Sequence, residues 1–347
     1  MEEGFVEKLT FSTRGFLSSD ERLHKPAAHV FDKMKARFEH TRDIMSIRQT
    51  FRDLVAGPDL LVMPGAYDAL SARIIEAQGF KAVSCGGYAA VGSLLAQPDG
   101  GQSNMRDYAD HYARICSAVD VPVYVDADTG FGGVNNVRQM VRAFESAGVA
   151  GLFFTDQTFP NRCGYLPGKQ IVPVEQMLAK IKAALDARHD PDLFIGARTD
   201  GLSIEGIDRS IERCQLFMEA GADMAKPQGA DTLDAIGRIM REVPGPHFVT
   251  LSQAAGAIAV TLGDLQAIGA AAVTFPSTVL FAAAQGVRRV LEVLKRDGSL
   301  TAAGEDIMPL ADYYELVRLS AQTGREQAYD EAATDLARKR GMGRSPV

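Results

Sequence analysis

A repeated rhythm constrains the fold of this chain more than any other feature of its sequence. From Ser46 onward, a short apolar run ends in glycine or polar residues, a helical stretch follows, and the alternation occurs eight times. Short strands that alternate with helices predict parallel βαβ units. The eight runs are LLVMPG (60–65), KAVSCGG (81–87), PVYVDAD (122–128), GLFFTDQ (151–157), LFIGARTD (193–200), ADMAKPQ (222–228), HFVTLS (247–252) and AAVTFPS (271–277).

The number and span of these units predict an α/β protein built as a (β/α)₈ TIM barrel. Eight units fit a closed barrel better than an open sheet, and about 250 residues is the usual size of that fold. We expect the barrel over residues 46–300, after a polar N-terminal extension over residues 1–45. Residues 301–347 have a helical pattern without a strand, so we expect them to pack on the barrel or on a neighbouring subunit.

Charge and cysteine content argue against several classes of protein. The net charge is −7, with both signs mixed along the chain, which disfavours nucleic-acid binding through a basic face. The four cysteines form no CxxC pair, so we expect neither a disulfide scaffold nor a zinc site, and a cytoplasmic location. We expect no membrane span, since no apolar run reaches about 18 residues, and no signal peptide.

Two aspartates end the third predicted strand. Asp126 and Asp128 follow the apolar run VPVYV, and the period of two along a strand predicts that both carboxylates lie on one side. Two neighbouring carboxylates in a partly buried place need a cation or hydrogen-bond donors. Mg²⁺ takes one or two carboxylates and keeps several waters. The alternative is that the aspartates cap the next helix or face solvent.

Other strand ends carry groups that can bind an organic acid. Gly86 and Gly87 can present backbone N–H groups to a carboxylate, although an ordinary tight turn has the same sequence. Arg198 at a strand end predicts an anionic partner, either a substrate carboxylate or a neighbouring aspartate. Thr250 and Ser252 can donate to a carboxylate or fill turn hydrogen bonds.

A loop follows the fourth predicted strand and carries a cysteine. Cys163 lies between Arg162 and Gly164 in TFPNRCGYLPGKQ. A cationic neighbour favours the thiolate form, and a loop that closes can bring a thiol to a reacting carbon. The alternative is a passive cysteine.

Taken in order, these segments resemble the isocitrate lyase / phosphoenolpyruvate mutase superfamily over residues 46–330. The resemblance rests on PGAYDALSARIIEAQGFKAV, SCGGYAAVGSLLAQPD, VDADTGFG, NRCGYLPGK and ARTD. The loop with RCG is similar to that of the lyase branch. The resemblance therefore implies a magnesium-dependent enzyme, with Mn²⁺ as an alternative ion, that acts on a small carboxylic acid.

The resemblance also implies roles for individual residues. The metal ligands would be Asp126, Asp128 and Asp99; the catalytic residues would be Cys163, Arg198 and Tyr88; the substrate-binding residues would be Gly86, Gly87, Arg162, Gly164, Tyr165, Gln228, Thr250 and Ser252. Arg198 would bind a carboxylate or the developing oxyanion, and Cys163 would protonate the departing carbanion. Members of the superfamily are usually homodimers or homotetramers that exchange a C-terminal helix, which would account for residues 301–347.

This sequence departs from the lyase pattern at several strand ends. Thr155 and Gln228 stand where the lyases have glutamate, and Asn161 and Tyr165 stand where they have lysine and histidine. Lys226 adds a cation that can meet an extra anionic group. The loss of the glutamates makes the rim less negative, which argues against isocitrate and methylisocitrate as substrates.

Three functions remain open at this level. The first is a carbon–carbon lyase that cleaves a 2-hydroxy mono- or dicarboxylic acid and releases a 2-oxo acid, pyruvate or glyoxylate, and a carboxylate. The second is other chemistry at the same metal site: decarboxylation or hydrolysis of a 2-oxo acid, or a phosphonate-type rearrangement. The third is a metabolite-binding protein without catalysis. The residues do not identify the general base; Tyr88 and a metal-bound water are the candidates.

Overall fold

The computed structural model describes residues 47–164, 166–252 and 260–340 of the chain. Each of the eight predicted runs contains one short strand, which confirms the predicted alternation. The strands are β1 (Leu61–Pro64), β2 (Val83–Cys85), β3 (Val123–Asp126), β4 (Gly151–Thr155), β5 (Phe194–Thr199), β6 (Met224–Pro227), β7 (Phe248–Thr250) and β8 (Ala272–Phe275).

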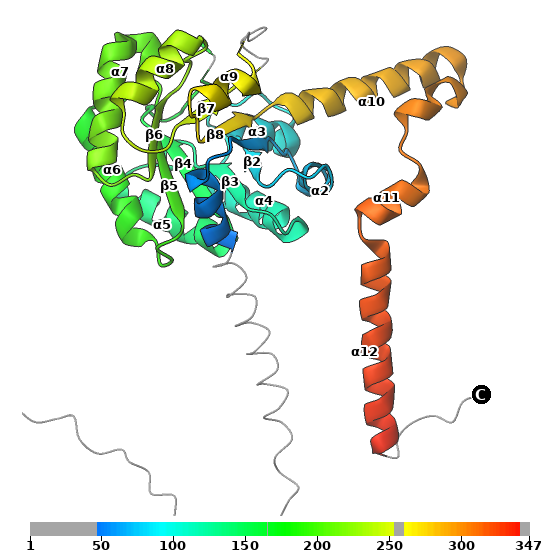
Figure 1. Ribbon diagram of the computed structural model, residues 1–347. Coiled ribbons are helices and arrows are strands. Elements are labelled where there is room, and N and C mark those ends of the chain that lie inside the picture. The colour runs from blue at the N-terminus through cyan, green and yellow to red at the C-terminus, as the bar shows by residue number, and fades with distance from the viewer. Residues whose placement is uncertain (1–46, 165, 253–259, 341–347) are drawn as a thin grey trace, which may run out of the picture. The chain divides into compact units, whose positions relative to one another are not determined.

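The strands are parallel and form the wall of a barrel (Figure 1). One set runs in the order β2-β3-β4-β5-β6 and the other in the order β1-β8-β7. The two sets meet between β1 and β2, where Gly65 pairs with Ser84 and the Ala66 N–H donates to the Ser84 carbonyl at 2.8 Å. They meet again between β6 and β7, where Lys226 Nζ donates to Thr250 Oγ1. The predicted (β/α)₈ barrel is therefore confirmed.

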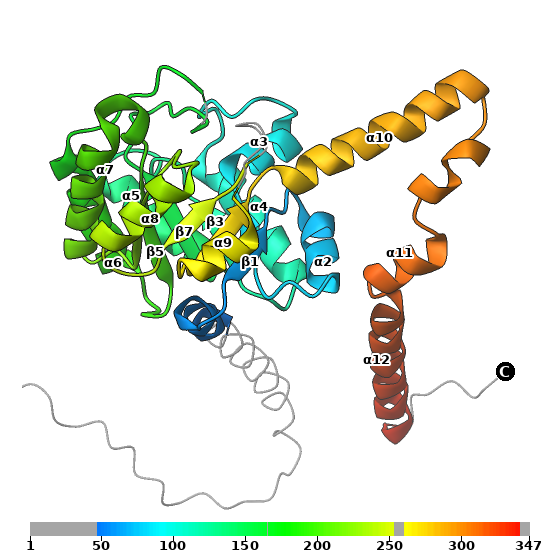
Figure 2. The same ribbon diagram turned by 45° about the horizontal axis from the view of Figure 1, so that its top comes forward.

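Helices surround the strands on the outside (Figures 1 and 2). In α5 the buried residues Val137, Met140, Val141 and Phe144 recur every three or four positions, so one face packs against the wall. The helices are α2 (Ala69–Ala77), α3 (Gly87–Leu95), α4 (Met105–Ala118), α5 (Val134–Ser146), α6 (Val174–Ala187), α7 (Leu202–Glu219), α8 (Leu233–Glu242), α9 (Leu262–Ala267), α10 (Thr278–Asp297), the 3₁₀ helix η2 (Thr301–Asp306), α11 (Leu310–Leu316) and α12 (Leu319–Lys339).

Aromatic residues close the barrel at the N-terminal ends of its strands. Phe51, in the helical residues 47–56, is fully buried. Its ring stacks on Tyr124 at 5.6 Å and meets Phe194 edge-on at 5.4 Å. Ring pairs of this kind add to the hydrophobic stabilisation. Aromatic side chains therefore fill the interior of the barrel at this end.

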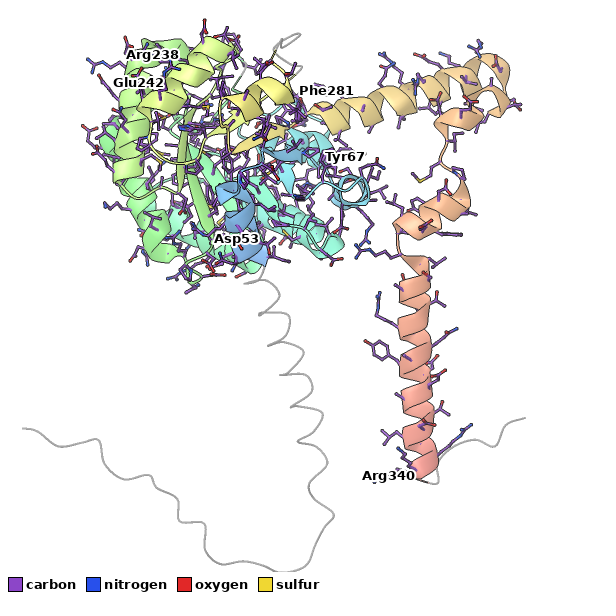
Figure 3. The ribbon with its side chains drawn as sticks, viewed as in Figure 1. Asp53, Tyr67, Arg238, Glu242, Phe281 and Arg340 are labelled. Atoms are coloured by element: carbon purple, nitrogen blue, oxygen red, sulfur yellow. The ribbon has the colours of Figure 1, made fainter. Side chains whose placement is uncertain are left out.

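The chain after the barrel continues in α10, η2, α11 and α12. Phe281 lies where α10 begins (Figure 3). Its ring meets that of Tyr88 edge-on, with 5.8 Å between the ring centres. The helices α10, α11 and α12 contain no buried residue. Arg318, between α11 and α12, binds Glu76 at 2.7 Å and Asp120 at 2.8 Å. The extension predicted over residues 1–45 lies outside the described residues.

None of the described helices combines the length and the apolar character that crossing a membrane requires.

Candidate active site

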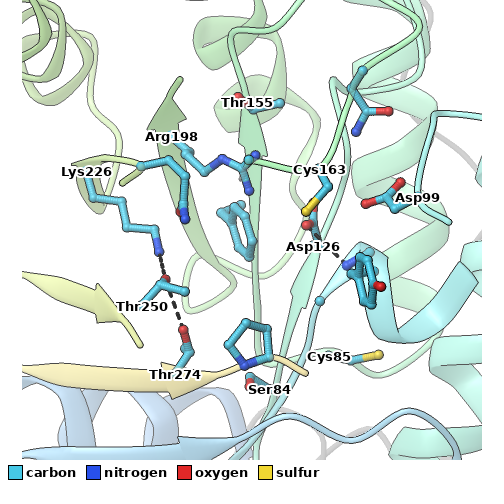
Figure 4. A pocket seen from close by; sticks show the side chains of 18 of the residues that line it. Ser84, Cys85, Asp99, Asp126, Thr155, Cys163, Arg198, Lys226, Thr250 and Thr274 are labelled. Carbon is cyan, nitrogen blue, oxygen red and sulfur yellow. Dashed lines mark hydrogen bonds between the residues drawn. The ribbon is translucent and has the colours of Figure 1, made fainter. Parts of the chain in front are cut away.

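A cavity opens at the carboxyl ends of the strands (Figure 4). Together with its mouth it holds about 700 Å³ of space. Its wall includes most of the residues that the sequence proposed for the site. These are Gly86, Gly87, Tyr88, Asp99, Asp126, Arg162, Cys163, Gly164, Arg198, Gln228 and Thr250.

One row of side chains crosses three neighbouring strands at this rim. Thr155 on β4 is the register partner of Arg198 on β5, and Arg198 is the register partner of Lys226 on β6. Register partners on parallel strands point to the same face of the sheet. All three residues line the cavity, so the barrel brings two cations to one side of it.

Arg198 is held by an aspartate two residues further along the chain. Its Nε donates to Asp200 Oδ2 at 2.9 Å, and its Nη2 lies 2.8 Å from the same oxygen. Thr155 Oγ1 also donates to Asp200 Oδ2, at 2.6 Å. Burial opposes the charged form of Asp200, but Arg198 and Lys169 outweigh it and lower its pKa to about 2. Burial also opposes the charge on Arg198, and Asp200 and Asp126 together raise its pKa above the usual value.

The opposite side of the cavity is acidic. Asp126 Oδ2 accepts a hydrogen bond from the Gly87 N–H at 3.2 Å. A Cβ on Gly87 would lie 3.3 Å from Asp99 Oδ2 and 3.4 Å from Asp126 Oδ2, so the absent side chain leaves room beside both carboxylates. Burial and the charge of Asp126 raise the pKa of Asp99 to about 6. Burial is also the main reason why the pKa of the Tyr108 hydroxyl is raised well above its usual value, and the charges of Asp99 and Asp126 add to it.

Asp128 does not lie on the cavity wall, in contrast to the simple expectation from strand spacing. The strand β3 ends at Asp126, and Asp128 adopts a left-handed backbone conformation with φ of 54°. The period of two therefore does not extend to Asp128. Its side chain is buried, and burial followed by the charge of Asp126 raises its pKa to about 7.

The acidic side fits a hydrated divalent ion. Asp99 Oδ1 and Asp128 Oδ2 are buried without a hydrogen-bond partner, and such oxygens are the ligands that Mg²⁺ prefers. Within residues 47–164, 166–252 and 260–340, no three His, Cys, Asp or Glu side chains form a ready-made metal cluster. The donor set therefore matches an ion bound by one or two carboxylates and several waters, not one enclosed by protein ligands.

The loop with Cys163 is tied to the rim by its neighbours. Gln157 accepts from the Arg162 N–H at 3.0 Å and donates to the Arg162 carbonyl at 2.9 Å. Lys169 Nζ donates to the Gly164 carbonyl at 2.6 Å. These bonds hold the backbone on both sides of Cys163, whose side chain lines the cavity between the acidic side and Arg198.

Ser252, another predicted residue, does not line the cavity. Ser252 is buried, with its Oγ 3.3 Å from Ser277 Oγ. Tyr165 lies outside the described residues. Thr250 lines the cavity, and its Oγ1 lies 3.1 Å from Thr274 Oγ1.

Lys226 is a cavity residue that the sequence identified as an extra cation without assigning it to the site. Burial, with Arg198 as the second cause, lowers its pKa to about 7. The sequence signal is a lysine inside a short run, ADMAKPQ, whose neighbours are apolar. Thr274 had no such signal, because a threonine in a β-strand is common.

Comparison with known proteins identifies the family. The profile described as phosphoenolpyruvate phosphomutase matches residues 51–295. The chain belongs to the phosphoenolpyruvate mutase / isocitrate lyase superfamily. It is 34% identical to the 2,3-dimethylmalate lyase of Eubacterium barkeri over 79% of this chain and 95% of that protein. The superfamily membership inferred from the sequence motifs is thereby confirmed.

Solved structures of superfamily members agree with the architecture. Oxaloacetate acetylhydrolase in complex with the inhibitor 3,3-difluorooxalacetate has a TM-score of 0.75 and 27% identity, covering 87% of this chain and 99% of that one. Phosphonopyruvate hydrolase in complex with oxalate and Mg²⁺ has a TM-score of 0.73 and 27% identity, covering 81% and 98%. Thr155 and Gln228, which stand where the lyases of the superfamily have glutamate, both line this cavity.

Proposed function

We propose that this protein is a magnesium-dependent carbon–carbon lyase. Its substrate would be a small 2-hydroxy carboxylic acid, which it would split into a 2-oxo acid and a carboxylate. A superfamily relative supports a carbon–carbon lyase: it is 34% identical to this chain and is a 2,3-dimethylmalate lyase.

The opposite charges at the two sides of one cavity carry this proposal. Asp99 and Asp126 line one side of the cavity, and Asp99 Oδ1 is buried there without a hydrogen-bond partner. Arg198 and Lys226 lie on the opposite side. A hydroxy acid bound to a cation would suit the acidic side, and the charge that leaves with the other fragment would suit the basic side. The phosphonopyruvate hydrolase complex with oxalate and Mg²⁺ supports magnesium as the ion.

Each residue has a definite part in such a cleavage. Asp126, with Asp99 and Asp128 nearby, would hold Mg²⁺, whose Lewis acidity would stabilise the 2-oxo acid as the carbon–carbon bond breaks. The hydroxyl proton leaves to a base, and the bonding electrons go to the departing fragment. Arg198 would bind the charge that develops there, and the Cys163 thiol would donate a proton to its carbon.

Tyr88 remains a candidate for the base, because it lines the cavity next to the Gly86–Gly87 turn. The Gly86 N–H, with Thr250, Gln228 and the loop around Arg162 and Gly164, would bind the organic acid. The Gly87 N–H, which donates to Asp126 Oδ2 at 3.2 Å, would have to leave that oxygen to do so.

The proposal extends to the assembly and its setting. The C-terminal helices would exchange between the subunits of a homodimer or homotetramer, since α10 and α12 leave Val287, Leu291 and Tyr329 at least 56% exposed. We propose a cytoplasmic enzyme, and Mn²⁺ as an ion that can replace Mg²⁺.

A product assay tests the proposed reaction. The full chain is incubated with Mg²⁺ and a panel of 2-hydroxy acids (the diacids malate and 2,3-dimethylmalate and the triacid 2-methylisocitrate), and 2-oxo acid and carboxylate products are quantified together. Equal amounts of both products, absent in Asp126→Asn and retained in the exposed α4 variant Asp110→Asn, support a lyase. Oxalate and CO₂ are followed in parallel with oxaloacetate as substrate. Hydrolysis or decarboxylation of oxaloacetate, without cleavage of any 2-hydroxy acid of the panel, contradicts the lyase and favours the second chemistry.

A further inference from the structure

Two cations share one aromatic ring at the basic side of the cavity. The Arg198 guanidinium carbon lies 5.9 Å from the centre of the Phe153 ring, and Lys226 Nζ lies 5.6 Å from the same centre. Their strands are neighbours, and the two residues are register partners. The structure therefore places both positive groups at one corner, which like charges avoid unless an anion joins them.

The anion that the protein itself supplies at this corner is already shared. Asp200 accepts from Arg198 and binds Lys169 Nζ at 3.2 Å. Lys226 forms no ion pair within the described parts of the chain, and the partner of its amine is the Thr250 hydroxyl. When Lys226 is protonated, the corner has three cations for one carboxylate.

Hydroxyl groups complete the corner. Thr250 Oγ1 accepts from Lys226 Nζ and lies 3.1 Å from Thr274 Oγ1 (Figure 4). Because Thr250 Oγ1 accepts from the lysine, the Thr250 hydroxyl can donate its hydrogen bond to Thr274 Oγ1. The Thr274 hydroxyl is then free to donate into the cavity. Both threonines line that cavity. An ammonium and a hydroxyl directed to the same space are suitable donors for a carboxylate.

We propose that Lys226 is a specificity-determining residue that binds a second carboxylate of the substrate and takes up one proton as it does so. This inference rests on the proposed function, because it assumes that the hydroxy-acid end of the substrate occupies the acidic side near Asp126. The far end of a dicarboxylic acid then reaches the corner of Lys226, Thr250 and Thr274. A monocarboxylic acid of the same length leaves the corner without an anion.

The surroundings of Lys226 explain why the amine takes up a proton when a carboxylate binds. Burial and then Arg198 lower its pKa to about 7, whereas Asp126 and Asp200 act in the opposite direction. Lys169 pairs with Asp200 at this corner, Tyr124 on β3 and Cys163 line the same cavity as Lys226, and His247 just before β7 lines a neighbouring pocket with Lys226. The amine is therefore mostly neutral at pH 8 in the free protein, and an arriving carboxylate restores the charged form, so binding and protonation are linked.

Calorimetry of the full chain with Mg²⁺ tests this inference. Titrations at pH 8 in two buffers with different ionisation heats report protons taken up per ligand bound. The probes are oxalate for the acidic side, 3,3-difluorooxaloacetate as a diacid, and 2-oxobutanoate as a monoacid of equal length. We expect uptake approaching one proton for the diacid and none for the other two.

Variants of Lys226 test whether this lysine is the group that takes up the proton. Lys226→Gln should abolish the uptake and weaken diacid binding roughly 10- to 100-fold, the effect of one charged hydrogen bond, while oxalate affinity stays within a few-fold. Lys226→Arg should retain part of the affinity without uptake. The exposed α6 variant Lys182→Gln should match the unmodified chain.

The outcomes separate the two proposals. If oxalate does not bind with Mg²⁺, the proposed function itself fails. If oxalate binds but diacid binding takes up no proton, or if Lys226→Gln weakens monoacid and diacid equally, the role of Lys226 is overturned while the lyase proposal stands. A lower kcat in Lys226→Gln with unchanged diacid affinity also contradicts selection of the carboxylate.

Discussion

Arg198 and Lys226 are register partners on adjacent parallel strands, and both cations lie within 6 Å of the same ring centre, that of Phe153. Only Arg198 has a carboxylate partner in the described residues, Asp200. The pair therefore differs in charge state: Arg198 remains charged, whereas the pKa of Lys226 is lowered to about 7.

This difference predicts a pH-dependent stability that originates at Lys226. Its pKa in the folded chain lies below that in the unfolded chain, so between about pH 7 and pH 10 the unfolded chain binds more protons and stability rises with pH. In Lys226→Met this rise should be missing. The variant should be more stable than the unmodified chain at pH 6, by a few kcal/mol, and the difference should shrink toward pH 10.

Denaturant unfolding at several pH values measures this difference. A constant difference between the two proteins from pH 6 to pH 10 would show that the lysine does not change its charge in this window.

Removing the metal should destabilise the protein through its acidic side. Asp99 Oδ1 and Asp128 Oδ2 are buried without partners, so an ion that binds there stabilises the folded state by mass action. We expect Mg²⁺ to raise the Tm in a concentration-dependent manner and EDTA to reverse it. In Asp126→Asn the Tm should no longer respond to Mg²⁺, whereas Asp110→Asn should respond as the unmodified chain does. A full Mg²⁺ response in Asp126→Asn would contradict this assignment.

Cys163→Ser tests the proton donor. A serine hydroxyl is a much weaker acid than a thiol, so kcat should fall by about 10²- to 10⁴-fold, the usual contribution of a general acid. The affinity for oxalate with Mg²⁺ should stay unchanged, because the loop backbone is held by Gln157 and Lys169. Cys116→Ser on α4 is the control. Turnover equal to that of the control would exclude the thiol from the reaction.

Gly164→Ala tests how closely the loop must pack. A Cβ there would lie 2.8 Å from Gln228 Cγ and 3.3 Å from Asp200 Oδ1, so the loop must move away from β6. Overpacking of this kind costs typically about 1–3 kcal/mol. We expect the displaced loop to bind substrate more weakly and so to raise KM. Gly286→Ala, where a Cβ meets no atom within 4 Å, should leave KM unchanged. An unchanged KM in Gly164→Ala would show that the loop tolerates displacement.

The candidate site shows where reasoning from the sequence stops. Asp126, Arg198 and Cys163 could be predicted at the rim, because Asp126 and Arg198 lie at the carboxyl ends of β3 and β5, Cys163 lies in the loop after β4, and parallel strands end at one edge of the barrel. Asp128 could not be placed, since its position depends on the left-handed turn that follows β3. The sequence identified Lys226 as a cation, but its contacts with the Phe153 ring and the Thr250 hydroxyl depend on residues of other strands.

The sequence by itself determined the eight strand–helix units and the edge at which their polar ends gather, because hydrophobic periodicity and chain direction are local properties. The tertiary structure alone decided which charges meet. Lys169, which is distant in sequence, pairs with Asp200, and closure of the barrel brings β7 beside β6 so that Lys226 meets Thr250 and, among the described residues, no carboxylate. Charge pairing depends on distances between residues far apart in the chain, and those distances exist only once the barrel is closed.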